Sequence, residues 1–225
     1  MRVSLDLSLI KANDTIIVAN NRQVLAIKKS ISELKGTSRM PKVSSYKSWL
    51  EGYWNQNNPS RSTRLLTQFE LRFLLKEISK DEVTSNPETF IDELIKSYTI
   101  CKTYFIEISE LSSFGASPPR LFIDWIRKYD KFKKDHNCID HSDLFSDSLE
   151  SLKVHNKNGK YYCYGFNEPT PEQQKLFEIL ECIPLLQKNE NTNIPAYSFI
   201  DQETELKTIA KWAKEISIKN PDKKI

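Results

Sequence analysis

Two segments near opposite ends of the chain share one pattern, a short β-prone run followed by a polar turn and an amphipathic helix. The first begins with the β-branched run at residues 15–19 (TIIVA), and the second with the aromatic run at residues 161–164 (YYCY). Both runs predict strands, and the apolar spacing after each predicts a helix. Between them, residues 64–152 show only helical periodicity. The sequence therefore predicts an α/β fold in which two parallel strands share one sheet and a large all-helical subdomain is inserted between them.

The changes of pattern divide the chain into three parts. Residues 1–60 form the first part of the α/β domain, residues 61–155 the helical insertion, and residues 156–225 the return to the α/β domain. Residues 197–200 (YSFI) are a candidate third strand, and an amphipathic helix with its apolar side chains turned inward follows at residues 203–219. The Asn-Pro-Asp after this helix is typical of a lead into another strand. We therefore expect a fragment cut before a second domain, the alternative being a frayed natural terminus.

Several helix starts are marked by capping boxes or by a proline in the first turn. These signals lie at Thr67, Pro87, Pro118 and Thr170. A further helix, beginning at Ser44 or Ser45, carries aromatic residues at helical spacing. We interpret these rings as core residues, although exposed rings at the same spacing could stack on bases.

Glycine is scarce, with five residues in 225 where an ordinary protein carries roughly 7%. The five stand alone, so neither G-x-x-x-x-G-K-[ST] nor G-x-G-x-x-G can be written anywhere in the chain. Motifs of this kind cradle phosphates with backbone N–H groups. Standard glycine-rich nucleotide sites are therefore excluded, and we expect no cofactor.

Charge is unevenly distributed along the chain. Residues 1–80 hold 14 Lys and Arg against 6 Asp and Glu, a net of +8, whereas the remaining residues hold 19 against 24, a net of −5. The first third is therefore the part expected to contact phosphate. The alternative is a chance cluster of surface lysines.

No apolar run approaches the roughly 20 residues that cross a bilayer, and the amino terminus lacks the basic-then-apolar order of a signal peptide. The four cysteines form no C-x-x-C pair, which favours reduced thiols. We therefore expect a cytoplasmic protein that does not bind membranes.

The one cluster with metal-ligand residue types contains His136, Cys138, Asp140, His141 and Asp143. Its spacing matches no zinc motif, so we interpret it as a loop between helices, with Asp140 or Ser142 as a helix cap. No G-x-S-x-G is present, and the remaining histidine, His155, lies in a charged loop. We predict neither a metal site nor a catalytic site.

Two polar turns are the candidate binding positions. Asn20-Asn21-Arg22 follows the first predicted strand, at the carboxyl end where open parallel sheets place their ligands. Gly165-Phe166-Asn167-Glu168 follows the second predicted strand in the same way. Plain connecting turns are the alternative in both cases.

Three segments together resemble the amino-terminal, helicase-like region of AddB/RexB-type nuclease subunits, which carry a PD-(D/E)XK nuclease. TIIVANNRQVLAIKKSI with MPKVSSYKSWLEGYW resembles the strand, P-N-R-R and helix that open this region, with the next helix. YYCYGFNEPTPEQQKLFEIL is similar to the family's G-F-x-x-x-T-P-x-[QE] segment, which stands where active superfamily 1 helicases have their Walker B motif. DQETELKTIAKWAKEISIKNPDKKI resembles the helix that leads into the second helicase-like domain.

The resemblance implies a degenerate P-loop-helicase-like fold without ATPase chemistry. The phosphate loop is absent, and the Gly165-Phe166-Asn167-Glu168 turn offers one acid where the Walker B motif has an Asp-Glu pair. The implied protein is a bacterial DNA-repair exonuclease subunit. Its nuclease carboxylates, and any iron–sulfur cysteines, would lie beyond Ile225, so this fragment is not expected to be an enzyme.

The resemblance also implies partners and contact residues. In helicases of this kind the turn after the first strand contacts single-stranded DNA, which corresponds here to Asn20, Asn21 and Arg22. Further cations within reach of the phosphates are Lys28, Lys29, Arg39 and Lys42. A UvrD/AddA-like helicase subunit is the implied protein partner. The alternatives are a scaffold module that contacts such a helicase without binding nucleic acid, and a helical-domain enzyme whose pocket the sequence does not identify.

Overall fold

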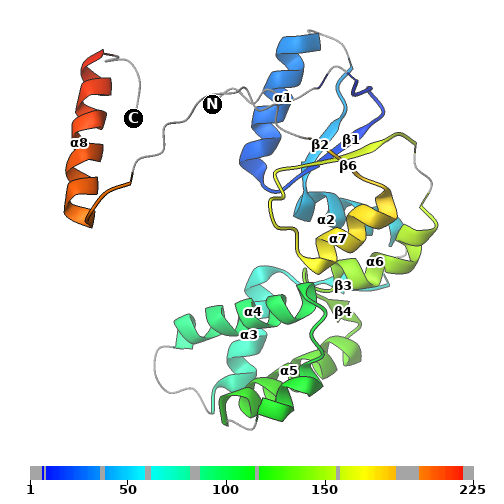
Figure 1. The fold of residues 1–225 in the computed structure, drawn as a ribbon. Helices are drawn as coiled ribbons and strands as arrows, with labels where there is room; N and C mark the ends of the chain where they lie inside the picture. The colour runs from blue at the N-terminus through cyan, green and yellow to red at the C-terminus, as the bar shows by residue number, and fades with distance from the viewer. Residues whose placement is uncertain are drawn as a thin grey trace. The chain divides into compact units, whose positions relative to one another are not determined.

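The computed structural model describes residues 7, 9–35, 39–58, 62–81, 87–114, 117–155, 158–185 and 198–219. The chain divides into two compact units, Met1–Lys188 and Asn189–Ile225, and each is described by itself. The first unit contains a parallel sheet with flanking helices and a lobe of further helices (Figure 1).

The sheet has four parallel strands in the order β2-β1-β5-β6. They are β1 (Thr15–Val18), β2 (Lys42–Ser45), β5 (Tyr161–Tyr164) and β6 (Ile183–Pro184). Thr15 lies opposite Lys42 on one side and opposite Tyr161 on the other, so the two predicted strands are neighbours. The α/β class and the parallel pairing of these two strands are confirmed. β2 and β6 were not predicted.

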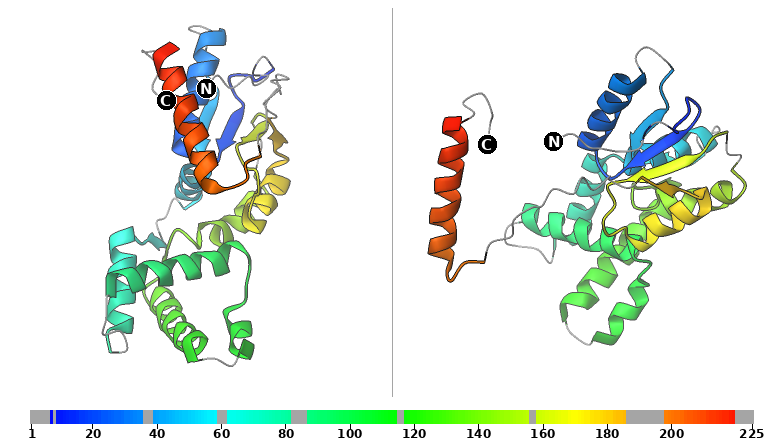
Figure 2. Two further views of the ribbon diagram at one scale, coloured as in Figure 1. Left: turned by 60° about the vertical axis from the view of Figure 1, so that its left-hand side comes forward. Right: turned by 45° about the horizontal axis from the view of Figure 1, so that its top comes forward.

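Helices cover both faces of the sheet (Figure 2). They are α1 (Asn21–Lys35), α2 (Tyr46–Asn57), α6 (Leu144–Lys153) and α7 (Pro171–Leu180). α1 packs on the face that carries Ile16 and Val18, whereas α2, α6 and α7 pack on the face that carries Ile17. Successive side chains of a strand point to opposite faces, so β1 contributes to two cores and is apolar and buried from Ile16 to Val18.

The aromatic residues of α2 lie in the core. Trp49 stacks on Tyr53 with ring centroids 5.3 Å apart, and Trp54 donates from Nε1 to Asp147 at 2.6 Å. The three rings are at most 5% exposed. Their interpretation as packing residues is confirmed.

The elements between α2 and α6 form a helical lobe with its own core. The lobe contains α3 (Gln68–Ser79), α4 (Pro87–Thr103), the 3-10 helix η1 (Ile108–Phe114) and α5 (Ser117–Asp135). α3 begins at the predicted capping box, in which Thr67 Oγ1 accepts from the Glu70 backbone N at 3.2 Å and the Glu70 carboxylate accepts from the Thr67 backbone N at 2.8 Å.

A two-stranded parallel sheet also lies in this part of the chain, formed by β3 (Arg64–Leu65) and β4 (Cys138–Ile139). The expectation that residues 64–152 are wholly helical is therefore wrong. Strands of two residues are too short for an alternating pattern to show in the sequence.

The edge of the main sheet also differs from the prediction. The edge strand is β6, whereas residues 198–200 of the candidate third strand lie outside any strand and Tyr197 lies outside the described residues. β6 contains Pro184. A proline has no backbone N–H to donate to a neighbouring strand, and a sheet tolerates this at an edge, where one side of the strand has no neighbour. A two-residue edge strand with a proline carries no strand signal in the sequence.

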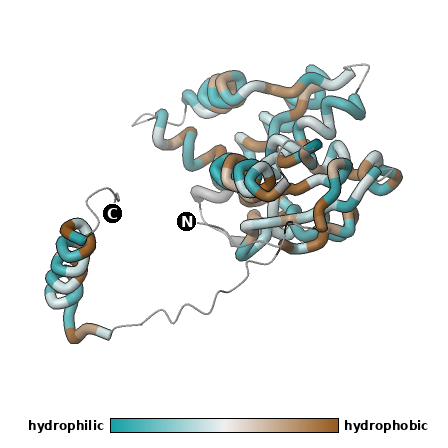
Figure 3. Tube along the Cα trace, turned by 90° about the horizontal axis from the view of Figure 1, so that it is seen from above, coloured by the Kyte–Doolittle hydropathy of each residue, from teal (hydrophilic) through white to brown (hydrophobic). Residues whose placement is uncertain are grey.

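The second unit contains α8 (Gln202–Lys219), along which hydrophobic and hydrophilic residues are interspersed (Figure 3). The helix predicted over residues 203–219 is confirmed, whereas the predicted inward orientation of its apolar side chains is not: no residue of α8 is buried, and Leu206 and Ile209 are exposed. Over the described ranges, no helix is both long enough and apolar enough to cross a membrane.

A buried charge cluster joins the helical lobe to α6, one of the helices that cover the sheet. Lys133, near the end of α5, is 6% exposed, and its Nζ lies 3.0 Å from Asp140 Oδ2 and 2.5 Å from Asp143 Oδ2. The same amine donates to Tyr98 Oη at 2.7 Å, and Tyr129 donates to Asp140 at 2.9 Å. Asp140 follows β4 and Asp143 precedes α6, so the cluster fixes the turn between the two parts.

Burial and the neighbouring cations act in opposite directions on the pKa of Asp143. Burial alone would raise the pKa of Asp143, but the Lys133 and Lys102 ammonium groups outweigh burial and hold it below its usual value. A depressed pKa stabilises the fold above the unfolded value of about 4, and this stabilisation is lost as the pH falls through the folded pKa.

We expect Lys133→Met to lower the free energy of unfolding by about 3–5 kcal/mol at pH 7, because Asp140 would stay buried without its cation and Asp143 would keep only Lys102. The loss should shrink as the pH falls below about 4 and through the lowered pKa of Asp143, because a protonated carboxyl no longer needs a cation. Urea denaturation at several pH values measures both effects. Lys134→Met, at the exposed neighbouring lysine, is the control and should change stability by less than about 0.5 kcal/mol. Equal effects of the two substitutions would contradict this role of Lys133.

Candidate functional site

The carboxyl ends of β1 and β5 meet where the strand order of the sheet reverses. From β1 the chain moves to β2 on one side, and β5 and β6 lie on the other side. In open parallel sheets ligands bind in the crevice at such a switch point. Val18 is in register with Tyr164, and the Ala19 backbone N donates to Tyr164 O at 3.2 Å. The structure thus places both predicted polar turns at the carboxyl ends of the two central strands of the sheet.

Gln23 connects the two turns. Its Oε1 accepts from the Ala19 backbone N at 3.1 Å, and its own backbone N donates to Asn20 Oδ1 at 3.1 Å. The side chain also lies against Gly165, where a Cβ atom would stand 2.1 Å from Gln23 Nε2. Gly165 has a φ of +81°, a conformation that strains any residue with a side chain. The left-handed backbone of the second turn therefore requires glycine, and a side chain there would also displace the end of the Gln23 side chain.

The first turn is shorter than the sequence suggested. Asn20 caps α1, while Asn21 and Arg22 belong to the first turn of this helix rather than to a loop. All three residues are exposed, and the first turn of α1 contains no acidic residue. Among the described residues Arg22 forms no ion pair. A helix amino terminus attracts anions through its partial positive charge, and Arg22 adds a full charge there.

Two of the other predicted cations lie on α1 and two lie beyond its end. Lys28 and Lys29 are exposed near its middle. Arg39 and Lys42 are exposed at the opposite edge of the sheet, because Lys42 begins β2 and lies opposite Thr15, the first residue of β1. A ligand that contacted all the predicted residues would therefore follow α1 from one edge of the sheet to the other, about 22 Å at 1.5 Å per residue.

A cavity of about 390 Å³ opens beside the second turn. Its lining consists of Gln23, Cys163, Tyr164, Gly165, Phe166, Asn167, Pro184 and Leu185. Burial raises the pKa of the Cys163 thiol, so this group stays neutral at pH 7. Phe166 packs on Phe177 with ring centroids 4.8 Å apart, while Asn167 and Glu168 are exposed. The lining therefore combines amide and aromatic groups and contains no carboxylate.

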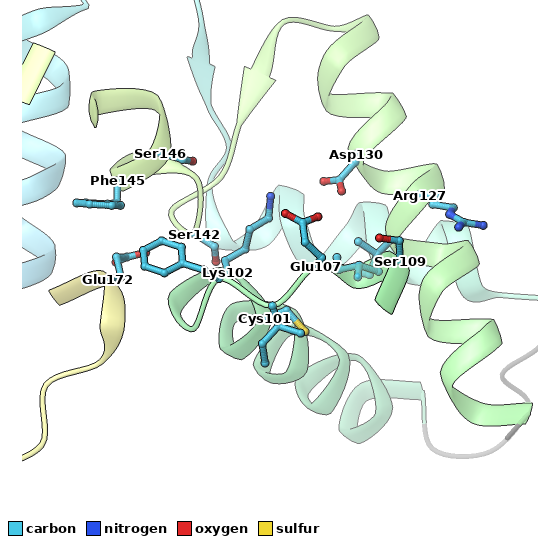
Figure 4. Close-up of a pocket in the computed structure, with 14 residues that line it drawn as sticks. Cys101, Lys102, Glu107, Ser109, Arg127, Asp130, Ser142, Phe145, Ser146 and Glu172 are labelled. Carbon is cyan, nitrogen blue, oxygen red and sulfur yellow. The ribbon is translucent and has the colours of Figure 1, made fainter. Parts of the chain in front are cut away.

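A second cavity of about 390 Å³ lies between the helical lobe and the start of α7 (Figure 4). Its charged lining residues are Lys102, Glu107, Arg127, Asp130 and Glu172. Lys102 Nζ lies 3.0 Å from Asp143 Oδ1, and Glu172, which is 7% exposed, accepts from Tyr46 Oη at 2.7 Å. Burial raises the pKa of Glu172. Lys102 thus pairs across the joint and Glu172 binds within the part that contains the main sheet, so we assign this cavity a structural role.

The histidines and the cysteine of the metal-type cluster lie in different surroundings. His136 stacks on a phenylalanine of α5, with ring centroids 4.0 Å apart, and Cys138 is buried in the core of the helical lobe. His141 Nε2 lies 3.7 Å from a glutamate of α2. Within the part of the chain that the structure describes, no group of three or more His, Cys, Asp or Glu side chains is arranged to hold a metal ion.

The capping assignment in this cluster needs a correction. Asp143, rather than Asp140 or Ser142, occupies the N-cap position of α6. Asp140 Oδ1 accepts from the Ser142 backbone N at 2.7 Å and so closes the preceding turn. Its other oxygen binds Lys133, a partner that the sequence does not indicate.

Comparison of the chain with known protein families and with curated proteins finds no match. The resemblance to AddB/RexB-type subunits therefore depends on the three segments quoted above.

Sequence reasoning missed Gln23. A signal was present, because Asn20 and Gln23 have the spacing of a capping box, in which the third helical residue reaches back to the N-cap. In the structure the Gln23 amide binds one residue earlier, at Ala19, and thereby also contacts the second turn.

Gly165→Ala should lower the free energy of unfolding by about 1–2 kcal/mol. Alanine would be forced into the left-handed backbone conformation of this turn, and its Cβ atom would displace the Gln23 side chain. Gly52 provides a matched control within α2, since a Cβ there meets nothing within 4 Å. Gly52→Ala should raise stability by about 0.5–1 kcal/mol through better helix propensity. Urea denaturation measures both, and a stabilising Gly165→Ala would contradict the geometry of the second turn.

Proposed function

We propose that this chain is an ATPase-inactive, helicase-like domain of a DNA-repair nuclease subunit, and that it binds single-stranded DNA at the carboxyl edge of its sheet. The observation that carries the proposal is the meeting of two polar turns at the switch point, with Arg22 and the start of α1 exposed beside them. The resemblance to AddB/RexB-type subunits adds the nature of the nucleic acid and the link to a nuclease.

Electrostatics supports a polyanionic ligand along α1. Residues 11–47 contain eight Lys and Arg and two Asp and Glu, a net of +6. One of the two acids, Asp14, is 3% exposed, and its carboxylate accepts from the backbone N atoms of Lys11 at 2.7 Å and Lys160 at 2.9 Å. The other acid, Glu33, is exposed and lies 4.0 Å from Lys29, so the segment presents a positive charge with one acidic interruption, which attracts a phosphate backbone.

The rest of the basic first third is neutralised within the helical lobe. Arg64 pairs with Glu70, Lys80 lies 3.2 Å from Glu77, and Lys76 lies 2.8 Å from a carboxylate of α4. The cations of residues 1–80 that remain without a carboxylate partner among the described residues therefore lie mainly in and around α1.

The first turn also supports the loss of nucleotide binding. In a phosphate loop the N–H groups at the start of the helix are free to bind the ligand. Here the Gln23 N–H donates to Asn20 Oδ1 and the Ala19 N–H is shared by Gln23 Oε1 and Tyr164 O. Two donors of the turn are thus already occupied, which favours binding through the Arg22 side chain over a backbone cradle.

A scaffold function is the second candidate, in which the chain contacts a UvrD/AddA-like helicase subunit without binding DNA. The observation that favours it is the amphipathic pattern of α8, with Leu206, Ile209, Ala213 and Ile216 at helical spacing. An amphipathic helix of this kind suits a groove on a protein partner.

The DNA proposal is tested by fluorescence anisotropy with a labelled single-stranded oligonucleotide over a range of salt concentrations. Binding should weaken with salt, and Arg22→Glu/Lys28→Glu should reduce affinity at least about tenfold and flatten the dependence of log K on log salt by about 1.4, at 0.7 per lost phosphate contact.

Lys96→Glu/Lys153→Glu is the matched control. It makes the same change in net charge at exposed lysines that already pair with Glu93 and Glu150. Binding of the control should stay within about twofold of the parent chain. The proposal fails if the parent chain does not bind the strand or if both double variants weaken binding equally, and the first result would leave the scaffold function.

A further inference from the structure

α5 presents a row of cations to solvent. The row consists of Arg120, Arg127, Lys131 and Lys134, with Lys128 beside it, and all five are exposed. The first four follow one another at intervals of seven, four and three residues, so they share one face of the helix. The exposed acids of α5 are Asp124 and Asp135, so its exposed charges sum to 5 − 2 = +3. We call this set the α5 basic row.

Packing and ion pairs leave the α5 basic row accessible. The opposite side of α5 carries Ile126 and Tyr129, which are fully buried in the core of the helical lobe. Arg127 lies 3.9 Å from Asp124, with both side chains about two-thirds exposed, and such surface pairs contribute little. Figure 4 shows the Arg127 guanidinium pointing away from the carboxylates of Glu107 and Asp130.

The length of the row covers several phosphates of a regular polyanion. Neighbouring residues of the row lie about 5–6 Å apart where they are three or four positions apart, and Arg120 and Lys134 are separated by about 21 Å along the helix axis. One strand of a DNA duplex carries one phosphate per 3.4 Å of its axis. The row therefore spans the rise of about six phosphates and holds its charges on a rigid element.

The chemistry of the row favours duplex over single-stranded nucleic acid. Surfaces that bind single strands combine cations with aromatic rings on which bases stack. The aromatic residues of α5 face inward instead: Trp125 and Tyr129 are buried, and Phe122 and Phe132 are half-buried in the core of the helical lobe. The exposed face of α5 therefore offers cations and no ring of its own, which suits contact with the phosphate backbone; the exposed Phe105, which lines a cavity with Arg127, lies outside α5.

We propose that the α5 basic row is a second nucleic-acid contact, which binds the phosphate backbone of double-stranded DNA. This inference rests on the proposed function, because the duplex would belong to the same DNA whose single-stranded part contacts Arg22. The row lies in the part of the chain with a net charge of −5, so a count of charge along the sequence hides it. Its signal is instead the helical spacing of the basic residues.

The test uses Arg127→Gln/Lys131→Gln/Lys134→Gln, which removes three positive charges and keeps residues with good helix propensity. Anisotropy with a blunt labelled duplex should show at least a tenfold loss of affinity, and the slope of log K against log salt should fall by about 2–3, close to one unit per lost contact. Affinity for the single strand should stay within about twofold. Lys128→Gln/Lys131→Gln, with an expected fall in slope of about 2, serves if the triple variant is unstable in urea.

The control is Lys76→Gln/Lys80→Gln/Lys96→Gln, which makes the same change in net charge at exposed lysines that pair with Glu88, Glu77 and Glu93. It should leave duplex binding nearly unchanged. Equal losses in the two triple variants, or no loss in either, would overturn the inference.

The remaining outcomes separate this inference from the proposed function. A parent chain that binds the single strand but not the duplex overturns the α5 contact and leaves the proposed function standing. A parent chain that binds the duplex through α5 but not the single strand confirms the contact and overturns the proposed single-strand site. If the row variant loses binding to phosphatidylserine vesicles while duplex binding is unchanged, the row recognises an anionic membrane surface and the inference is wrong.

Discussion

One buried ammonium group, that of Lys133, determines how the two parts of the first unit are joined. Removing a charge from water costs several kcal/mol, so a buried lysine is tolerated only where carboxylates and hydroxyls surround it closely. Asp140 and Asp143 meet this need only if the turn between β4 and α6 has one particular shape. A fully satisfied polar network of this kind is directional, and it rigidifies the joint more than apolar packing would.

Local signals sufficed to predict much of the fold. The strand at Thr15–Val18 and the helices with capping boxes carry their information within a few residues, and they were correct. Strands of two residues such as β3 and β6 form through partners far along the chain, which no local window contains. Lys133 was missed for the same reason, because in the run KFKKD it is indistinguishable from its solvated neighbour Lys134. The site shows the same division: its two turns were predicted, whereas the contact of Gln23 with Gly165 depends on the pairing of β1 with β5.

The scarcity of glycine has a conformational consequence as well as a functional one. Phe105, Asn137 and Glu181 have φ angles of 56°, 48° and 53° just after α4, α5 and α7, where many helices place glycine. Each such residue costs roughly 1–2 kcal/mol in this conformation, less for asparagine. Glycine is kept at Gly165, and at Gly159, where a Cβ atom would lie 2.2 Å from a backbone oxygen. Two of the few glycines, Gly159 and Gly165, thus stand where geometry requires them, whereas Gly52 in α2 does not.

Pairing, rather than net charge, decides which cations a ligand can reach. Arg72 and Lys76 lie in the basic third of the chain, yet both are bound to Glu88, while Lys131 lies in the acidic remainder and has no ion pair among the described residues. The proposed contact at α1 lies in the part that contains the main sheet, and the proposed contact at α5 lies in the helical lobe. The Lys133 joint therefore separates them. If both bind one DNA molecule, the angle between its single-stranded and duplex parts is set by the rigidity of that joint. A variant that loosens the cluster would then weaken binding to a junction of the two forms while leaving each form bound as before.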